Sequence, residues 1–203
     1  MDMSHLQGER HLDVGCDTGA LALAFARLYG TLPTGVDVSR HAILEALRRG
    51  LNAHHGAIDT LPDQDSNFHL ITAIDLIEHV VDPEALLKEI GRRLRPGGVC
   101  YLETPNIESR VYNLGRTFAR LTRNTPARIF ERLFPDEHIQ YFSKTGLKLA
   151  SARAGLEAVH LSSRSLRPSD IATSAPIGLA VSAIDATSRD RLLLCAVLRR
   201  PDR

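Results

Sequence analysis

The sequence predicts an α/β domain with a doubly wound, mostly parallel sheet, and three stretches carry this prediction. In the first, the apolar residues 12–14 are followed by a glycine turn and then by an Ala/Leu-rich segment with helical periodicity. In the second, a short strand over residues 34–38 precedes an amphipathic helix over residues 40–49. In the third, residues 67–75 form an apolar run that is too continuous for one-sided burial, as expected of a central parallel strand.

The glycine turn over residues 15–19 is the first candidate binding site. Gly15 and Gly19 permit positive φ angles and a close approach of the backbone to a ligand, and the first N–H groups of the following helix point over the turn. Asp13, at the end of the preceding strand, can accept hydrogen bonds from an ammonium group or from N–H groups of the loop. The dinucleotide fingerprint G-x-G-x-x-G is absent, which disfavours an NAD-dependent oxidoreductase.

The next strand ends in an acid, Asp37. An acid at this place in a doubly wound sheet can accept hydrogen bonds from both hydroxyls of a ribose that lies across the neighbouring turn. Ser39 is a suitable N-cap for the helix over residues 40–49, and Gly50 is its stop signal. Asp37 is therefore predicted to bind a ribose rather than to be a solvated loop acid.

The rest of the chain also alternates between predicted strands and predicted helices. A weak strand is expected within residues 52–61, and Asp82 and Pro83 begin a helix whose buried stripe includes Leu86 and Leu94. A turn at residues 96–98 leads to a strand over 99–105. A helix capped by Ser143 and strands over 156–163 and 192–200 complete the chain, with a short helix possible over 176–186.

Several motifs occur in the order and spacing of one enzyme superfamily. They are DVGCDTG, GVDVS, FHLITAIDLIEHVVDPEALLKEI, LRPGGVCYLETPN and DEHIQYFSKTGLKLASARAGLEAV. Over about three quarters of its length, the chain resembles the class I S-adenosylmethionine (SAM) methyltransferases that are related to the ubiquinone-pathway O-methyltransferases. The resemblance implies one Rossmann-like domain over residues 1–203, with seven strands in the order 3-2-1-4-5-7-6 and an antiparallel last strand. It also implies methyl transfer from SAM to a small-molecule acceptor, with O-methylation expected.

The resemblance assigns a set of cofactor-binding residues, two of which depart from the family pattern. The set is Asp13, Gly15, Cys16, Asp17, Gly19, Asp37, Val38, Ala57, Ile58, Asp59 and Asp75. Asp17 replaces the middle glycine of D-x-G-x-G-x-G, and Asp tolerates the left-handed conformation better than most residues. Ala57 stands where family members often have an acid beside the adenine. Either Asp59 substitutes for that acid, or backbone groups of Ala57 and Ile58 hold the base.

The Glu78-His79 pair after the fourth strand indicates how an acceptor could be deprotonated. An O–H acceptor must lose a proton, and the candidates for a general base at neutral pH are His79 and His138. Alternatively, the spacing of Asp75, Glu78 and His79 resembles the E-x-x-E-H metal-binding pattern of some ubiquinone-pathway and small-RNA 2′-O-methyltransferases. With His138 as a further ligand, this set could hold a divalent metal such as Mg²⁺. Many family members keep the Glu-His pair without any metal.

Residues at about 107–137 are expected to form a helical insertion that caps the acceptor pocket. An amphipathic hairpin whose arginines only solvate its outer face fits the same pattern. Only about ten residues precede the glycine turn, where family members usually carry one or two helices, which implies a more open cofactor site or a cover from elsewhere. Together with Asp17 and Ala57, this leaves a non-catalytic SAM-binding module as the alternative function.

Composition disfavours other classes of protein. The chain is 43% hydrophobic and 24% charged with a net charge of +1, so no nucleic-acid partner is expected. No run approaches the ~20 apolar residues of a membrane span, and the N-terminus is polar. The 3 cysteines lie far apart and outside any C-x-x-C pair, which favours a reducing cytoplasm. Nothing in the sequence specifies the oligomeric state.

Overall fold

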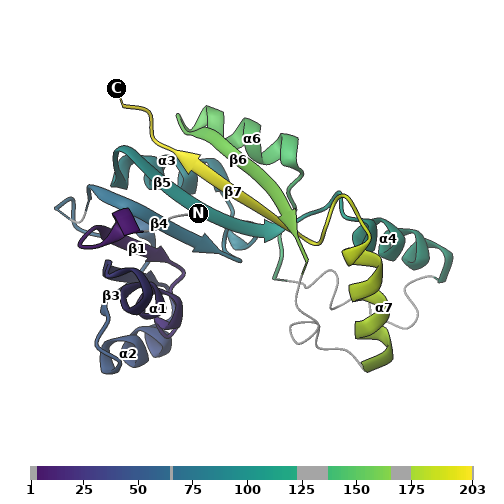
Figure 1. The fold of residues 1–203 in the computed structure, drawn as a ribbon, viewed down its shortest axis with the longest axis horizontal. Helices are drawn as coiled ribbons and strands as arrows, with labels where there is room; N and C mark the ends of the chain where they lie inside the picture. The colour runs from purple at the N-terminus through teal and green to yellow at the C-terminus, as the bar shows by residue number, and fades with distance from the viewer. Residues whose placement is uncertain (1–3, 65, 123–136, 166–174, 203) are drawn as a thin grey trace.

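A seven-stranded sheet in the order β3-β2-β1-β4-β5-β7-β6 forms the centre of the molecule (Figure 1). The structure is a computed structural model that describes residues 4–64, 66–122, 137–165 and 175–202. The strands are β1 (Arg10–Val14), β2 (Leu32–Asp37), β3 (Asn52–His55), β4 (Phe68–Ile74), β5 (Leu94–Pro105), β6 (Glu157–Arg164) and β7 (Leu193–Arg199). Within this sheet β7 is antiparallel to both of its neighbours, and the other pairs are parallel. The predicted fold class and strand order are confirmed.

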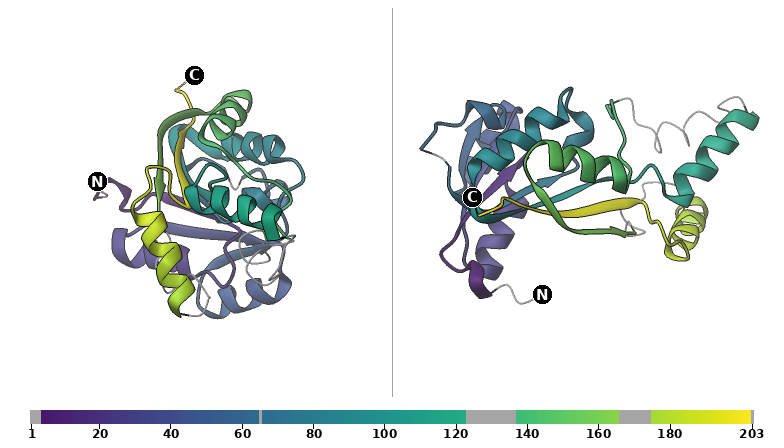
Figure 2. Two further views of the ribbon diagram at one scale, coloured as in Figure 1. Left: turned by 90° about the vertical axis from the view of Figure 1, so that its right-hand side faces the viewer. Right: turned by 90° about the horizontal axis from the view of Figure 1, so that it is seen from above.

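Helices cover both faces of the sheet. The described helices are α1 (Ala20–Tyr29), α2 (Arg40–Arg48), α3 (Pro83–Arg93), α4 (Arg110–Thr122), α6 (Lys144–Arg153) and α7 (Ala175–Ala186), with short 3₁₀ helices η1 (Ser4–Leu6), η2 (Ile58–Thr60) and η3 (Ile77–His79). Right-handed crossovers from β1 to β2 and from β4 to β5 run in opposite directions, so α1 and α3 lie on opposite faces. Figure 2 shows α3 and α6 side by side. Among these helices, none combines the length and the hydropathy needed to cross a membrane.

Each face has its own apolar core. The larger core joins the central strands to α3 and α6 and includes Ile71, Leu87, Leu102 and Leu147. The smaller one lies under α1 and α2 and is formed by Cys16, Ala22, Ile43, Ala46 and Leu51. Packing there is so close that a Cβ on Gly35 would lie 2.6 Å from the Cys16 sulfur. The two cores fix the carboxyl ends of β1, β2 and β4, where the candidate site lies.

The predicted helix caps are present in the structure. Ala42 N–H donates to the Ser39 hydroxyl at the start of α2, and the Asp82 carboxylate and the Ser143 hydroxyl accept equivalent bonds at the starts of α3 and α6. Since Ser, Asp and Pro act locally at helix starts, the first residues of α2, α3 and α6 follow from sequence alone. The short helix expected near the C-terminus is also present, as α7.

Two sequence expectations differ from the structure. Leu94 was expected on the buried stripe of the helix, but α3 ends at Arg93 and Leu94 begins β5. The turn expected at residues 96–98 does not interrupt the strand, because Gly97 N–H donates to the Arg200 carbonyl and a register shift against β4 absorbs the irregularity.

The first part of the expected insertion is α4, which packs against α7 beyond the carboxyl end of β5 (Figure 1). Residues 123–136 of the insertion lie outside the described residues.

Candidate active site

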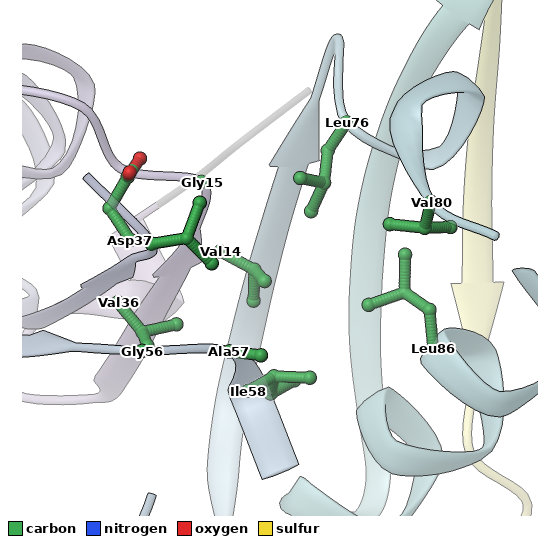
Figure 3. A pocket seen from close by; sticks show the side chains of 11 residues that line it. Val14, Gly15, Val36, Asp37, Gly56, Ala57, Ile58, Leu76, Val80 and Leu86 are labelled. Atoms are coloured by element: carbon green, nitrogen blue, oxygen red, sulfur yellow. The ribbon is translucent and has the colours of Figure 1, made fainter. Parts of the chain in front are cut away.

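A pocket opens at the carboxyl edge of the sheet, between the ends of β1 and β2 on one side and α3 on the other (Figure 3). It is open to solvent and is lined by Val14, Gly15, Val36, Asp37, Val38, Gly56, Ala57, Ile58, Leu76, Val80 and Leu86. The only carboxylate among these lining residues is that of Asp37. An apolar wall with one acid at its edge suits a nucleoside, whose base is flat and whose sugar carries hydroxyls.

The glycine turn has the backbone that its sequence predicts. Gly15 and Gly19 have φ angles of +73° and +77°, and a Cβ on Gly19 would lie 2.7 Å from Leu51 Cδ2. Asp17, which replaces the middle glycine of the motif, is itself left-handed with φ +46°. The substitution at Asp17 is therefore accommodated within the turn, whose shape does not require glycine at that position.

Asp37 connects the glycine turn to the end of β2. One carboxylate oxygen accepts a hydrogen bond from Asp17 N–H at 2.9 Å, and the other accepts from Ser39 N–H at 2.7 Å. Each oxygen has a further lone pair. Figure 3 shows the carboxylate beside Gly15, above the apolar part of the pocket. The two backbone bonds hold the carboxylate in one orientation before any ligand arrives, which favours binding of paired hydroxyls.

Asp13 lies behind the glycine turn, outside the lining residues. Its carboxylate is buried and accepts hydrogen bonds from the Thr72 hydroxyl at 2.6 Å and from the backbone of Ala22 in α1. Thr72 Oγ1 also lies 2.9 Å from His11 Nε2. Burial raises the pKa of Asp13 to about 7 and lowers that of His11 to about 4. In the structure, the bonds of Asp13 join β1 to β4 and to α1, and ligand contact stays a prediction.

Three other residues from the predicted cofactor set lie around the pocket in different ways. Ala57 and Ile58 line it, whereas Asp59 is exposed in η2 and is not a lining residue. Contact of Ala57 or Ile58 with a base stays a prediction. Cys16 belongs to the smaller core, and burial, reinforced by the Asp13 and Asp37 carboxylates, raises the pKa of its thiol to about 12.

Sequence reasoning missed part of the apolar wall. Leu76, Val80 and Leu86 line the pocket, and a Cβ on Gly15 would lie 3.2 Å from Leu76 Cδ1. Leu76 and Val80 flank the Glu-His pair, and Leu86 belongs to the predicted buried stripe of α3. Their apolar character alone indicates burial, and only the fold shows that they face a cavity.

A second cluster gathers Glu78, His79 and His138. One potential ligand atom from each of the three lies within 4.8 Å of the others. The two imidazole rings meet edge to face with their centroids 4.7 Å apart. Glu78 is fully buried, with one oxygen accepting from the Thr104 hydroxyl at 2.9 Å, while its Oε1 and His138 Nδ1 have no partner among the described residues. Burial raises the pKa of Glu78, and burial together with His79 lowers that of His138.

The segment that carries His138 is bound to η3 through main-chain groups. His79 Nδ1 lies 2.9 Å from the Glu137 carbonyl, and because a carbonyl only accepts, this nitrogen is the donor. The Glu78 carbonyl accepts from the N–H groups of Ile139 and Gln140 at 3.1 and 3.3 Å. These bonds bring two histidines that are far apart in sequence to one edge of the sheet.

Asp75 lies at the end of β4 but outside this cluster. It has a φ of +49°, and its N–H donates to the Glu103 carbonyl at 3.1 Å. Desolvation and the nearby Glu103 carboxylate raise the pKa of Asp75. The Glu103 carboxylate is in turn held by Arg164 and by the Tyr101 hydroxyl. The structure therefore brings together three of the four predicted metal ligands, and Asp75 is neither in that group nor among the lining residues of the pocket.

The sheet order, the glycine turn and the acid at the end of β2 define a nucleotide-binding α/β domain of the methyltransferase type. Residues 3–161 match the family described as "Methyltransferase domain", and the chain belongs to that family. The predicted relationship is thereby confirmed.

Curated relatives and solved structures agree with this assignment. The chain is 37% identical over 117 residues to a ubiquinone biosynthesis O-methyltransferase of Idiomarina loihiensis, covering 54% of this chain and 48% of the relative. It is 34% identical over 113 residues to the protein of that name from Coxiella burnetii, covering 53% of this chain and 48% of the relative. These matches span about half the length of those relatives.

The similarity of fold extends over nearly the whole chain. A structure of the Haloferax volcanii Trm112 methyltransferase activator in complex with a putative methyltransferase matches with a TM-score of 0.68 and 18% identity, covering 96% of this chain and 84% of the other. A possible histamine N-methyltransferase from Thermotoga maritima matches with a TM-score of 0.63 and 20% identity, with the same coverage. At these identities the likeness concerns the fold alone.

Proposed function

We propose that the protein is a SAM-dependent methyltransferase that methylates an oxygen atom of a small-molecule acceptor. The observation that carries the proposal is the Asp37 carboxylate, held by two backbone N–H groups at the edge of an apolar pocket. Asp37 would accept the ribose hydroxyls, and adenine would lie between Ile58 and Leu86. The relatives named O-methyltransferases support oxygen as the methylated atom.

The chain's own residues supply alignment and proton transfer. When bound, SAM supplies a methyl group that its sulfonium already activates. Asp37 and the glycine turn orient the cofactor, so that an acceptor near η3 meets it in a fixed geometry. The Glu137 carbonyl orients the His79 ring through Nδ1, and the lowered pKa of His138 favours the neutral form of that ring. Either imidazole can accept the proton of an acceptor hydroxyl.

The direct test is binding followed by turnover. Calorimetric titration of nucleotide-free protein with SAM and with S-adenosylhomocysteine is expected to give micromolar Kd values. Incubation with SAM and a panel of phenolic, sugar and carboxylic acceptors is then expected to release S-adenosylhomocysteine with at least one oxygen acceptor. Binding without turnover of any acceptor would favour the non-catalytic SAM-binding module. Absence of binding would contradict both assignments.

The second cluster supports an alternative to base catalysis by its histidines, namely a divalent metal site formed by Glu78, His79 and His138. Glu78 Oε1 and His138 Nδ1 are buried without a partner among the described residues, and one potential ligand atom of each of the three side chains lies within 4.8 Å of the others, which fits such an ion. One carboxylate and two imidazoles suit Mn²⁺ or Zn²⁺ at least as well as the Mg²⁺ that the sequence pattern indicates. A metal there would lower the pKa of an acceptor hydroxyl.

Chelation separates this proposal from simple base catalysis. Thorough treatment with EDTA is expected to abolish turnover but to leave the Kd for SAM unchanged, because the three donors lie outside the lining of the pocket. Metal analysis of the untreated protein is expected to show a divalent ion that is lost from a Glu78→Gln variant. Full turnover after chelation would contradict the metal site and leave His79 or His138 as the base.

A further inference from the structure

We infer that Arg93 is a positioning residue for cofactor binding, because it fastens one wall of the pocket to the helix that forms the opposite wall. The inference rests on the proposed function, since the ligand whose affinity it controls is SAM. Arg93 does not line the pocket itself. Its role follows from what it holds in place.

The Arg93 guanidinium is buried and donates in three directions. It is 0% exposed at the C-terminal end of α3. Its two terminal nitrogens donate to the carbonyls of Leu61 and Pro62 at 2.5 and 2.6 Å, and its Nε donates to Glu89 at 2.8 Å. Burial of a charged group is costly unless its hydrogen bonds are made, so this arrangement resists any displacement of the two carbonyls.

The two carbonyls end the loop that forms the wall. At the start of this loop, Gly56 N–H donates to the Asp37 carbonyl at 2.9 Å. At its end lie Leu61 and Pro62, and between these two anchors are Ala57 and Ile58, which line the pocket. The loop is therefore attached to β2 at one end and to α3, through Arg93, at the other. Between these anchors the loop is supported by the single turn of η2, by the hydrogen bond from the Thr60 hydroxyl to the Ala57 carbonyl at 2.7 Å, and by the packing of Ile58 and Leu61 in the larger core.

The opposite wall belongs to the same helix as Arg93. Leu86 lines the pocket and lies two helical turns before Arg93, so both residues share one face of α3. Arg93 thereby sets the distance between Ile58 and Leu86, the two side chains between which an adenine would lie. Without the guanidinium, the carbonyls of Leu61 and Pro62 lose a charged donor, and conformations of the loop that close or widen the pocket become more populated.

The test compares Arg93→Lys with an Arg153→Lys control variant. Lysine keeps the charge but cannot donate to both carbonyls and to Glu89 in the planar arrangement of a guanidinium. In ligand-free Arg93→Lys, hydrogen exchange of the backbone amides in residues 56–61 is expected to accelerate by about tenfold or more. The Kd for SAM is expected to rise by about tenfold, because only part of the population has the loop in place. The kcat at saturating SAM and the KM for the acceptor are expected to stay within about twofold.

Arg153 provides the control because its guanidinium is exposed and pairs with the Glu84 carboxylate of α3, not with Glu89 or the loop carbonyls. Arg153→Lys is expected to leave both loop exchange and SAM affinity at wild-type values. An Arg93→Lys protein with a lower Tm but unchanged exchange and affinity would overturn the inference and show a purely structural role. If wild-type protein bound no SAM, the proposed function would fail, while the exchange measurement would still test the attachment of the loop.

A milder variant covers the case in which Arg93→Lys does not fold. Glu89→Gln keeps Arg93 but removes the carboxylate that orients its Nε. It is expected to weaken SAM binding by about threefold and to accelerate exchange in the same loop, since a charged hydrogen bond becomes a neutral one. Wild-type affinity and exchange in Glu89→Gln, with Arg93→Lys unfolded, would overturn the inference.

Discussion

Replacement of Asp37 by alanine is expected to raise the Kd for SAM by at least about a hundredfold, because hydrogen bonds from a carboxylate to two ribose hydroxyls each contribute about 1.5–3 kcal/mol. The same change removes the acceptor for Asp17 N–H, so the glycine turn loses its attachment to β2. Calorimetry with SAM and S-adenosylhomocysteine measures the effect, and circular dichroism establishes that the variant is folded.

Asp59→Ala is the matched control for this experiment. Asp59 is an acid in the adjacent 3₁₀ helix η2, but it is exposed and outside the lining of the pocket. Its removal is expected to leave SAM affinity unchanged. A folded Asp37→Ala protein with wild-type affinity would contradict the ribose assignment. Loss of SAM binding in Asp59→Ala, with wild-type affinity in Asp37→Ala, would instead indicate that the Asp59 side chain contacts the adenine.

The second large effect concerns the pH dependence of stability. Asp13 and His11 are buried on either side of the Thr72 hydroxyl, and burial shifts their pKa values in opposite directions. The pKa of Asp13 rises from 3.8 to about 7 on folding, so the folded state binds the carboxyl proton more tightly than the unfolded state does. The stability that Asp13 contributes is therefore lost as pH rises towards 7. The pKa of His11 falls from 6.5 to about 4, so the stability that His11 contributes is present above pH 6.5 and is lost as pH falls towards 4. Between pH 4 and 6.5 the two contributions oppose each other.

Single substitutions are expected to expose each contribution. In Asp13→Asn, the free energy of unfolding should rise by about 3 kcal/mol between pH 4 and 6.5, because only the His11 contribution remains. In His11→Gln, it should fall by a similar amount, about 3–4 kcal/mol, between pH 4 and 7. Urea unfolding at several pH values measures both slopes.

His41→Gln serves as the control for loss of an imidazole, since His41 is exposed on α2. Its stability profile is expected to follow that of the wild type. If Asp13→Asn and His11→Gln also followed the wild-type profile, the protonation of these two residues would not be coupled to unfolding, which would contradict the pH dependence expected from their burial.

Much of the cofactor side of the site could be predicted from sequence because it depends on local conformation. Glycine at positions 15 and 19 and the Ser or Asp before α2, α3 and α6 act within a few residues of where they stand. The positive φ of Asp17 is one that Asp tolerates better than most residues. The order of the strands followed from the resemblance to a known family, and the structure confirms it.

Other features required the tertiary structure. The choice between Asp59 and the backbone of Ala57 and Ile58 depends on the direction in which one turn of 3₁₀ helix faces. The meeting of His79 with His138, and the separation of Asp75 from them, depend on how the segment after the insertion docks onto η3.

The class of fold, the glycine turn and an acid at the end of the second strand could be predicted from the sequence, because backbone preferences and the periodicity of burial encode them. Which side chains share a cavity, and which buried groups hold its walls, became apparent only in the folded chain. Arg93 illustrates the difference: in sequence it is one of several arginines near a helix end, where positive charge is expected in any case. Only the folded chain places its guanidinium on the carbonyls of a loop from another βα unit, because such contacts arise from packing between elements.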